Sequence, residues 1–327
     1  MRRTFLTCAL ATVAAAMAPP VRAQASPYPT RPVHFIVPAS AGGPGDVIAR
    51  LFAEPLGRAL GQPVIVDNKP GASLTLGTAA VAQAQPDGYT LLFTTSTPIV
   101  MVPFTMKKAP YDVQRDLMPV AHLGSTALVL YVNASSAIHD VKQLVTAARS
   151  QPQAANYGSY GNGSSAHVLG EMLNRQTQLS MVHVPYKGVA PELQDLVAGN
   201  LMAAVADIGT AAPLVKAGRI RPVAVTGTKR ASALPDVPTF AEQGISGMEP
   251  FSPWWGVFAP AQTPQPIVNQ LSVELSKLVR QPEMQARLFA LGIDATGTTS
   301  SQAAEITRAE IAKWQSIIRS VSYINFE

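Results

Sequence analysis

Two glycine-rich turns constrain most strongly what this sequence can fold into. Each turn lies between an apolar segment and an amphipathic segment. The first covers residues 39–45 (ASAGGPG) and the second covers residues 158–163 (GSYGNG). A strand that turns through glycines into a helix directs unpaired backbone N–H groups and the positive end of the helix dipole toward one point, which suits an anion. The two turns therefore predict that one acid is held between two lobes.

Strand-like and helix-like patterns alternate along the chain. The first series predicts strands at 33–37, 63–66, 89–94 and 120–123, with helices at 47–60 and 76–84. The second series predicts strands at 128–132, 155–158, 181–184, 201–206 and 222–226, with helices at 141–149, 166–176 and 191–198. Such alternation indicates an α/β protein with parallel strand pairing. About 300 residues are too many for most single cores and fit two lobes.

The last quarter of the chain does not form a third domain. It predicts one strand at 254–259 and helices at 264–280, 282–291 and 300–321, which is too little sheet to stand alone. We expect these elements to return to the first lobe, so that residues 26–124 and 251–327 form one lobe and residues 125–250 the other. The chain then crosses near Ser125 and near Phe251, and two crossings make a hinge beside a closing cleft.

The first 25 residues predict a signal peptide. They combine Arg2 and Arg3, an apolar stretch, and small residues before the expected cleavage site. The arginine pair is compatible with either a Sec or a twin-arginine signal. Cys8 is the only cysteine and leaves with this segment, so the mature chain has no disulfide or thiol chemistry.

Charge and motif content argue against several functions. Three of the 25 basic residues and none of the 20 acidic ones lie in the signal segment, which leaves a net charge of +2, and no basic stripe indicates a nucleic-acid partner. The five histidines are scattered, so no metal or other cofactor is expected. Nucleotide-binding and Gly-x-Ser-x-Gly motifs are missing. A secreted hydrolase using Ser164 or Ser165 with His167 is the alternative from another functional class.

In an open α/β sheet, ligands bind beyond the carboxyl ends of the strands. This rule selects the two turns, including Gly163, together with Thr95, Ser96 and Asp207. The rule also selects residues 185–188 (PYKG). Lys187 is the only cation in the selected segments, so an acid would be held by backbone amides, hydroxyls and water. Structural roles stay open for several residues: capping for Asp46, Ser164 and Ser165, packing for His167, and hydrogen bonding for Asp207.

The sequence resembles the substrate-binding receptors of tripartite tricarboxylate transporters, the Bug-type periplasmic receptors. The resemblance covers nearly all of the mature chain. It is carried by residues 62–72 (QPVIVDNKPGA), 86–90 (PDGYT), 161–167 (GNGSSAH), 183–188 (HVPYKG), 234–239 (LPDVPT) and 258–260 (FAP).

The resemblance implies a two-lobed periplasmic-binding-protein fold of type II, with two mixed sheets flanked by helices and the ligand cleft between the lobes. It also implies a non-enzymatic, monomeric receptor that binds an organic acid and delivers it to a membrane permease, or presents it to a sensor kinase. Its ligand-contacting positions correspond here to Ala41, Gly42, Gly43, Asp46, Ser164, Ser165 and His167.

This chain departs from the family pattern within the two turns. Ala39 and Ala41 replace an aromatic residue and a proline, and Pro44 removes both an N–H group and a hydroxyl. Tyr160 is bulkier than the usual small residue. Because a small dicarboxylate needs donors at both ends, these changes favour an aromatic or longer-chain carboxylate.

Overall fold

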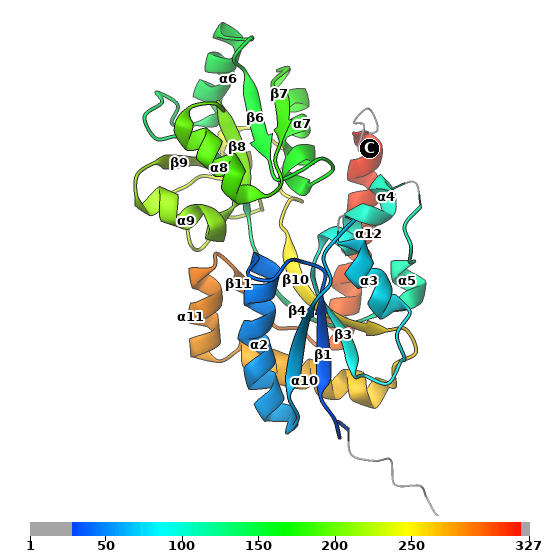
Figure 1. Ribbon diagram of the computed structural model, residues 1–327. Coiled ribbons are helices and arrows are strands. Elements are labelled where there is room, and N and C mark those ends of the chain that lie inside the picture. Colours follow the sequence, from blue (N-terminus) through cyan, green and yellow to red (C-terminus); the bar gives the residue numbers. More distant parts are fainter. Residues whose placement is uncertain (1–27, 73, 107, 322–327) are drawn as a thin grey trace, which may run out of the picture.

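The computed structural model describes residues 28–72, 74–106 and 108–321, and the predicted signal peptide lies outside them. The chain forms two lobes, each built on one β-sheet with helices on both faces (Figure 1). The predicted α/β class with two mixed sheets is confirmed.

The six-stranded sheet forms the first lobe. Its spatial order is β11 (Asp294–Ala295), β4 (Leu117–Ser125), β10 (Trp254–Pro260), β3 (Thr90–Thr95), β1 (Val33–Val37) and β2 (Val64–Asn68). Strand β1 pairs in parallel with β2 and β3, whereas β10 runs antiparallel to both β3 and β4. The predicted strand at 254–259 therefore returns to the first sheet, where it lies between two strands from the start of the chain.

The five-stranded sheet forms the second lobe. Its order is β7 (Val182–Pro185), β6 (Asn156–Ser159), β8 (Ala203–Asp207), β5 (Leu128–Asn133) and β9 (Ile220–Val225). Strand β6 pairs in parallel with β7 and β8, and β5 runs antiparallel to β8 and β9. In both sheets, then, the strand that follows a crossing is inserted antiparallel among the others. Parallel pairing was predicted, and it holds for β1, β2 and β3 in the first sheet and for β6, β7 and β8 in the second.

Helices surround both sheets. In the first lobe they are α2 (Pro44–Leu60), α3 (Thr75–Ala82), the π-helix η2 (Thr97–Met101), α4 (Val102–Thr105), α5 (Val113–Asp116), α10 (Gln265–Val279), α11 (Pro282–Ala290) and α12 (Ser300–Ser320). In the second lobe they are α6 (Val141–Ser150), α7 (Ser165–Thr177), α8 (Val189–Ala198), α9 (Ile208–Lys216) and the 3₁₀ helix η3 (Ala241–Gln243). The sequence analysis did not predict α9, because Gly209 and Pro213 interrupt its helical pattern.

The central strands β3, β5 and β8 bury both of their faces, as expected for a sheet covered by helices on each side. In β5, Leu128 and Leu130 pack into one apolar cluster and Val129 and Tyr131 into another. The cluster that contains Leu128 extends from α6 and α7 of the second lobe to η2 and α12 of the first. One continuous core therefore joins the lobes on this side.

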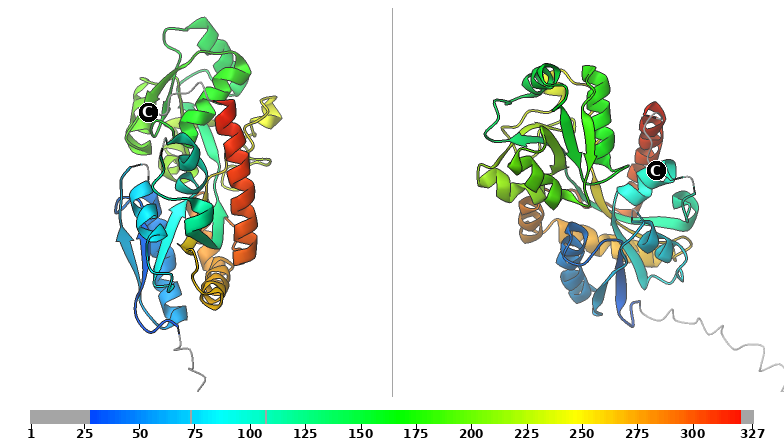
Figure 2. Two further views of the ribbon diagram at one scale, coloured as in Figure 1. Left: turned by 90° about the vertical axis from the view of Figure 1, so that its right-hand side faces the viewer. Right: turned by 45° about the horizontal axis from the view of Figure 1, so that its top comes forward.

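The two chain crossings lie side by side. The N–H of Thr126, in the first crossing, donates to the carbonyl of Pro253 in the second at 2.8 Å. Helix α12 forms a third connection, since it runs along the molecule from the first lobe to the second (Figure 2). Near its end, Arg175 Nη1 of α7 donates to the Ser320 carbonyl at 2.7 Å, and Trp314 packs edge-on against Phe251.

Candidate ligand-binding site

A cavity of about 540 Å³ lies between the two sheets, where the carboxyl ends of β1, β3 and β8 meet the two crossings. Most of its wall is apolar. The apolar lining consists of Val37, Pro38, Ala39, Pro44, Val47, Ile48, Leu74, Phe93, Leu128, Val189, Pro253, Trp255, Leu291 and Ile293. Polar groups come from Thr94, Thr95, Thr97, Thr126, Tyr160, Ser165, Asp207 and Thr210. Within the described part of the chain, Asp207 is the only charged side chain in this lining.

The first glycine-rich turn is held closed by its own helix. Gly42 adopts a left-handed φ of 77°, which favours glycine, and Gly43 N–H donates to the Ser40 carbonyl at 3.1 Å. The N–H of Gly42 donates to Asp46 Oδ2 at 2.9 Å, and Arg50 Nε donates to the same oxygen at 3.0 Å. The hydrogen bond from Arg50 lowers the pKa of Asp46. Asp46 is therefore a buried, ionised side chain that stabilises the turn by hydrogen bonding.

The second turn repeats this geometry with different chemistry. Gly163 has a φ of 69°, and Ser164 N–H donates to the Gly161 carbonyl at 3.2 Å. The N–H of Gly163 donates to Nδ1 of His167 at 3.1 Å. His167 occupies the third position of α7, as Asp46 does in α2. In both turns, a side chain from the first helical turn thus binds the N–H of a left-handed glycine.

The His167 ring is held unprotonated by its surroundings. It stacks on His183 with a ring-centroid distance of 3.8 Å and an interplanar angle of 8°, and His183 Nε2 lies 2.6 Å from Ser159 Oγ. Burial lowers the pKa of His167 to about 4, and burial followed by the charge of His167 lowers that of His183 to about 4. Because unfolded histidines protonate near pH 6.5, the protein loses stability as the pH falls from there through 4.

We expect Nδ1 of His167 to remain unprotonated at pH 6 and to gain a proton only near pH 4, where it can no longer accept the Gly163 N–H. Nitrogen-15 NMR of the histidine rings across pH 3.5–7.5 measures this, with the exposed His139 as internal reference. The Gly163 amide signal should shift in the same pH range. Titration of His167 near pH 6.5, or a Gly163 amide insensitive to it, contradicts the assigned hydrogen bond.

Tyr160 lies at the boundary between the second turn and the cavity. Its hydroxyl lies 2.5 Å from Ser165 Oγ and near the backbone N–H of Ala166. Burial raises the pKa of Tyr160, so the phenol stays protonated. The start of α7 is thus covered by a side chain of its own loop.

The predicted ligand-binding residues divide into three groups. Those that line the cavity are Gly42, Thr95, Ser165 and Asp207. Those that hold the turns are Gly43, Asp46, Gly163, Ser164 and His167. Two lie elsewhere: Ala41 is exposed, and the N–H of buried Ser96 donates to the Trp254 carbonyl at 2.9 Å. Asp207 both lines the cavity and caps α9, since Oδ1 accepts the Thr210 N–H at 2.8 Å.

Sequence reasoning missed most of the apolar wall. Leu74, Val189 and Leu291 come from three distant parts of the chain and converge only in the fold. The sequence carries one signal for such a wall, the Trp254-Trp255 pair at the second crossing. Trp255 lines the cavity, whereas Trp254 is buried beside His122.

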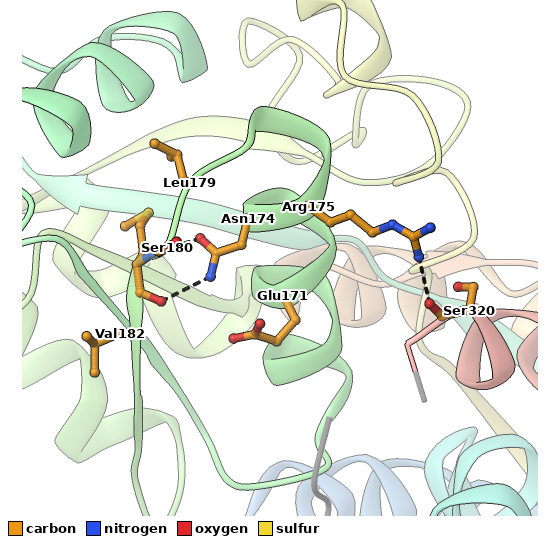
Figure 3. A pocket seen from close by; sticks show the side chains of 8 residues that line it. Glu171, Asn174, Arg175, Leu179, Ser180, Val182 and Ser320 are labelled. Atoms are coloured by element: carbon orange, nitrogen blue, oxygen red, sulfur yellow. Dashed lines mark hydrogen bonds between the residues drawn. The ribbon is translucent and has the colours of Figure 1, made fainter. Parts of the chain in front are cut away.

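A second hollow lies outside the cavity, against the second half of α7 (Figure 3). Its lining comes from α7, the start of β7 and the end of α12, and includes Glu171, Asn174, Arg175 and Ser320. Figure 3 shows the Arg175 guanidinium reaching the Ser320 carbonyl. Asn174 in turn exchanges hydrogen bonds with the backbone of Met181. These polar side chains therefore join structural elements.

The described part of the chain has neither a metal-binding cluster nor a membrane-spanning helix. No group of three or more histidine, cysteine, aspartate or glutamate side chains is placed to hold a metal ion there. No helix among these residues is both long and apolar enough to cross a membrane.

Residues 48–323 match the family described as "Tripartite tricarboxylate transporter family receptor". Among curated relatives, the UPF0065 protein in the tcbD-tcbE intergenic region of Pseudomonas sp. (strain P51) is 36% identical over 292 residues, which cover 89% of this chain and 86% of the relative. Protein BugT of Bordetella pertussis is 32% identical over 320 residues, which cover 98% and 97%.

Two solved structures are similar throughout. An R. palustris protein with adipate superposes with a TM-score of 0.82 at 32% identity, covering 90% of this chain and 98% of that one. MatC from Rhodopseudomonas palustris with bound malate gives a TM-score of 0.78 at 30% identity, covering 89% and 100%. Both were solved with a carboxylic acid.

Proposed function

Because the chain belongs to the family of tripartite tricarboxylate transporter receptors, we propose that it captures an organic acid in the cavity between its lobes and delivers it to a membrane permease of that transporter class. The observation that carries the proposal is the pair of equivalent turns, each braced through a left-handed glycine, at one cavity. Similar structures with adipate and with malate support a carboxylate as the ligand.

The wall of the cavity favours an acid with an apolar body. Phe93, Trp255 and Tyr160 provide aromatic surface, and aliphatic side chains cover much of the rest. No cation among the described residues lines the cavity, so a carboxylate is held by helix N-termini and hydroxyls. The negative charge of Asp207 opposes a second carboxylate beside it. We therefore favour an aromatic or longer-chain carboxylate over succinate or citrate.

The remaining parts of the proposal follow from the family and the sequence. The receptor works in the periplasm as a monomer, after export directed by residues 1–25. Residues 26–124 with 251–327, and residues 125–250, form lobes that close on the acid. The receptor is not an enzyme: Ser164 Oγ accepts the His167 N–H as a helix cap, and Nδ1 of His167 accepts the Gly163 N–H, so this pair is not arranged as nucleophile and base.

A thermal-shift screen of the purified protein tests the proposal. The panel contains benzoate, hexanoate, adipate, malate, succinate and citrate, with the corresponding primary amides and alcohols as uncharged controls. An acid at a hundredfold excess over its Kd adds about 2.7 kcal/mol, which raises Tm by about 5 °C. We expect hexanoate or benzoate to give the largest shift and the uncharged controls none. Equal shifts from acids and controls would contradict carboxylate capture.

A further inference from the structure

The two turns differ in what covers the helix that each of them starts. When Gly42 is matched to Gly163 and Asp46 to His167, Tyr160 corresponds to Ala39 and Ala166 corresponds to Gly45. The side chain of Ala39 ends at Cβ and has no group that could accept a hydrogen bond from Gly45. In the second turn, the Tyr160 oxygen lies 2.5 Å from Ser165 Oγ and near the N–H of Ala166.

The position that Tyr160 fills is the one where an anion would bind. The first N–H groups of a helix have no partner within the helix, and Ala166 is the second residue of α7. The phenol oxygen lies near this N–H and contacts the neighbouring hydroxyl, so it occupies the place where a carboxylate oxygen would meet both groups. Tyr160 also lines the cavity, so it stands between the ligand space and these donors.

We propose that Tyr160 acts as a built-in substitute for a second carboxylate, so that the receptor selects acids with one carboxylate over acids with two. The inference rests on the proposed function and specifies its substrate class. The carboxylate of the ligand binds at the first turn, where no side chain makes a capping hydrogen bond to the start of α2. The other end of the ligand meets the Tyr160–Ser165 pair.

The chemistry of that pair limits what it can bind. One of the two hydroxyls donates to the other across 2.5 Å, which leaves a single O–H for the ligand. One donor suits a neutral oxygen, whereas a carboxylate has lone pairs for several donors. Asp207 lies close enough for its charge to act on Tyr160 and adds repulsion against a second anion.

The experiment compares hexanoate with adipate, which share a six-carbon chain and differ by one carboxylate. Calorimetry gives both affinities for the wild-type protein, Tyr160→Ala, Tyr160→Phe and Val189→Ala. In Tyr160→Ala the N–H of Ala166 and the Ser165 hydroxyl become available, so adipate should gain roughly tenfold or more relative to hexanoate. Tyr160→Phe keeps the ring as cover and should weaken both acids without changing their order. Val189→Ala enlarges the cavity elsewhere and should affect both acids alike.

The outcomes separate the two proposals. A wild-type preference for hexanoate that is reversed only in Tyr160→Ala supports the role of Tyr160. An adipate-to-hexanoate ratio that is the same in wild type and Tyr160→Ala, or a wild type that already prefers adipate, overturns that role and leaves acid capture standing. Failure of all four proteins to bind either acid, together with a negative thermal-shift panel, overturns both proposals.

Discussion

A Glu192→Gln variant is expected to be more stable than the wild-type protein by about 2–3 kcal/mol at pH 7 and by less than about 1 kcal/mol at pH 5. Glu192 lies in the first turn of α8 and is fully buried beneath the second sheet. Its Oε1 accepts the Val205 N–H at 3.1 Å, and its Oε2 has no hydrogen-bond partner. Burial raises the pKa of Glu192 to about 9.

The sign of the effect follows from proton binding. Glu192 keeps its proton in the folded protein at pH 7, whereas it loses the proton near pH 4.5 when the chain unfolds. Its contribution to stability is therefore complete below pH 4.5 and is lost as the pH rises from there to about 9. Glutamine is always neutral and escapes this loss. It also keeps an oxygen for the Val205 N–H, and its amide places two N–H donors where the protonated acid has one O–H.

Urea denaturation of both proteins at pH 5, 7 and 9 measures the effect. The advantage of the variant should increase at each step. Glu283→Gln serves as the matched control, because Glu283 is exposed on α11 and its replacement should change stability by no more than about 0.5 kcal/mol at any pH. A stability difference between Glu192→Gln and wild type that does not vary with pH would mean that Glu192 ionises in the folded protein.

A Gly45→Asp variant is expected to lose at least about a hundredfold in affinity for hexanoate while remaining folded. Gly45 is the second residue of α2 and lines the cavity. A Cβ atom there would lie 3.3 Å from Ala39 Cβ and 3.6 Å from the Trp255 ring. The added carboxylate would reach the N–H groups that are proposed to hold the ligand, and its charge would repel the acid.

Two further variants isolate the cause. Gly45→Ala adds the Cβ without the charge and should keep affinity within about fivefold, since its neighbours need to move only slightly. Ala59→Asp adds the same charge at an exposed position near the other end of α2 and should bind hexanoate normally. Calorimetry gives the affinities, and circular dichroism melts confirm folding. Wild-type affinity in Gly45→Asp would exclude the first turn as the carboxylate site.

Local sequence patterns predicted the elements more successfully than their pairing. Strand β1 has its predicted bounds, because Val33 to Val37 is a short apolar run between prolines. The two inserted strands, β5 and β10, show why pairing is harder to predict. Alternation of apolar residues specifies which side chains share a face, but it does not specify the direction of the neighbouring strand.

The location of the site was predicted, but the roles of its individual residues were not. The two turns were identified because glycine and helix signals are local. Their equivalence was hidden, because a carboxylate at Asp46 and an imidazole at His167 perform the same task with unrelated side chains. The hydroxyl contact of Tyr160 and the burial of Glu192 depend on loop geometry and on sheet packing, neither of which has a sequence period.

Helix α12 limits how the two lobes can move relative to each other. Two neighbouring strands alone, joined by the bond between Thr126 and Pro253, would leave one lobe free to rotate about a single axis. The contact of Arg175 with Ser320 is a third attachment, at the end of α12 (Figure 3). Rotation about the axis therefore changes the distance between α7 and the end of α12. Opening the cavity and straining or releasing that helix end are one coupled motion rather than two independent ones.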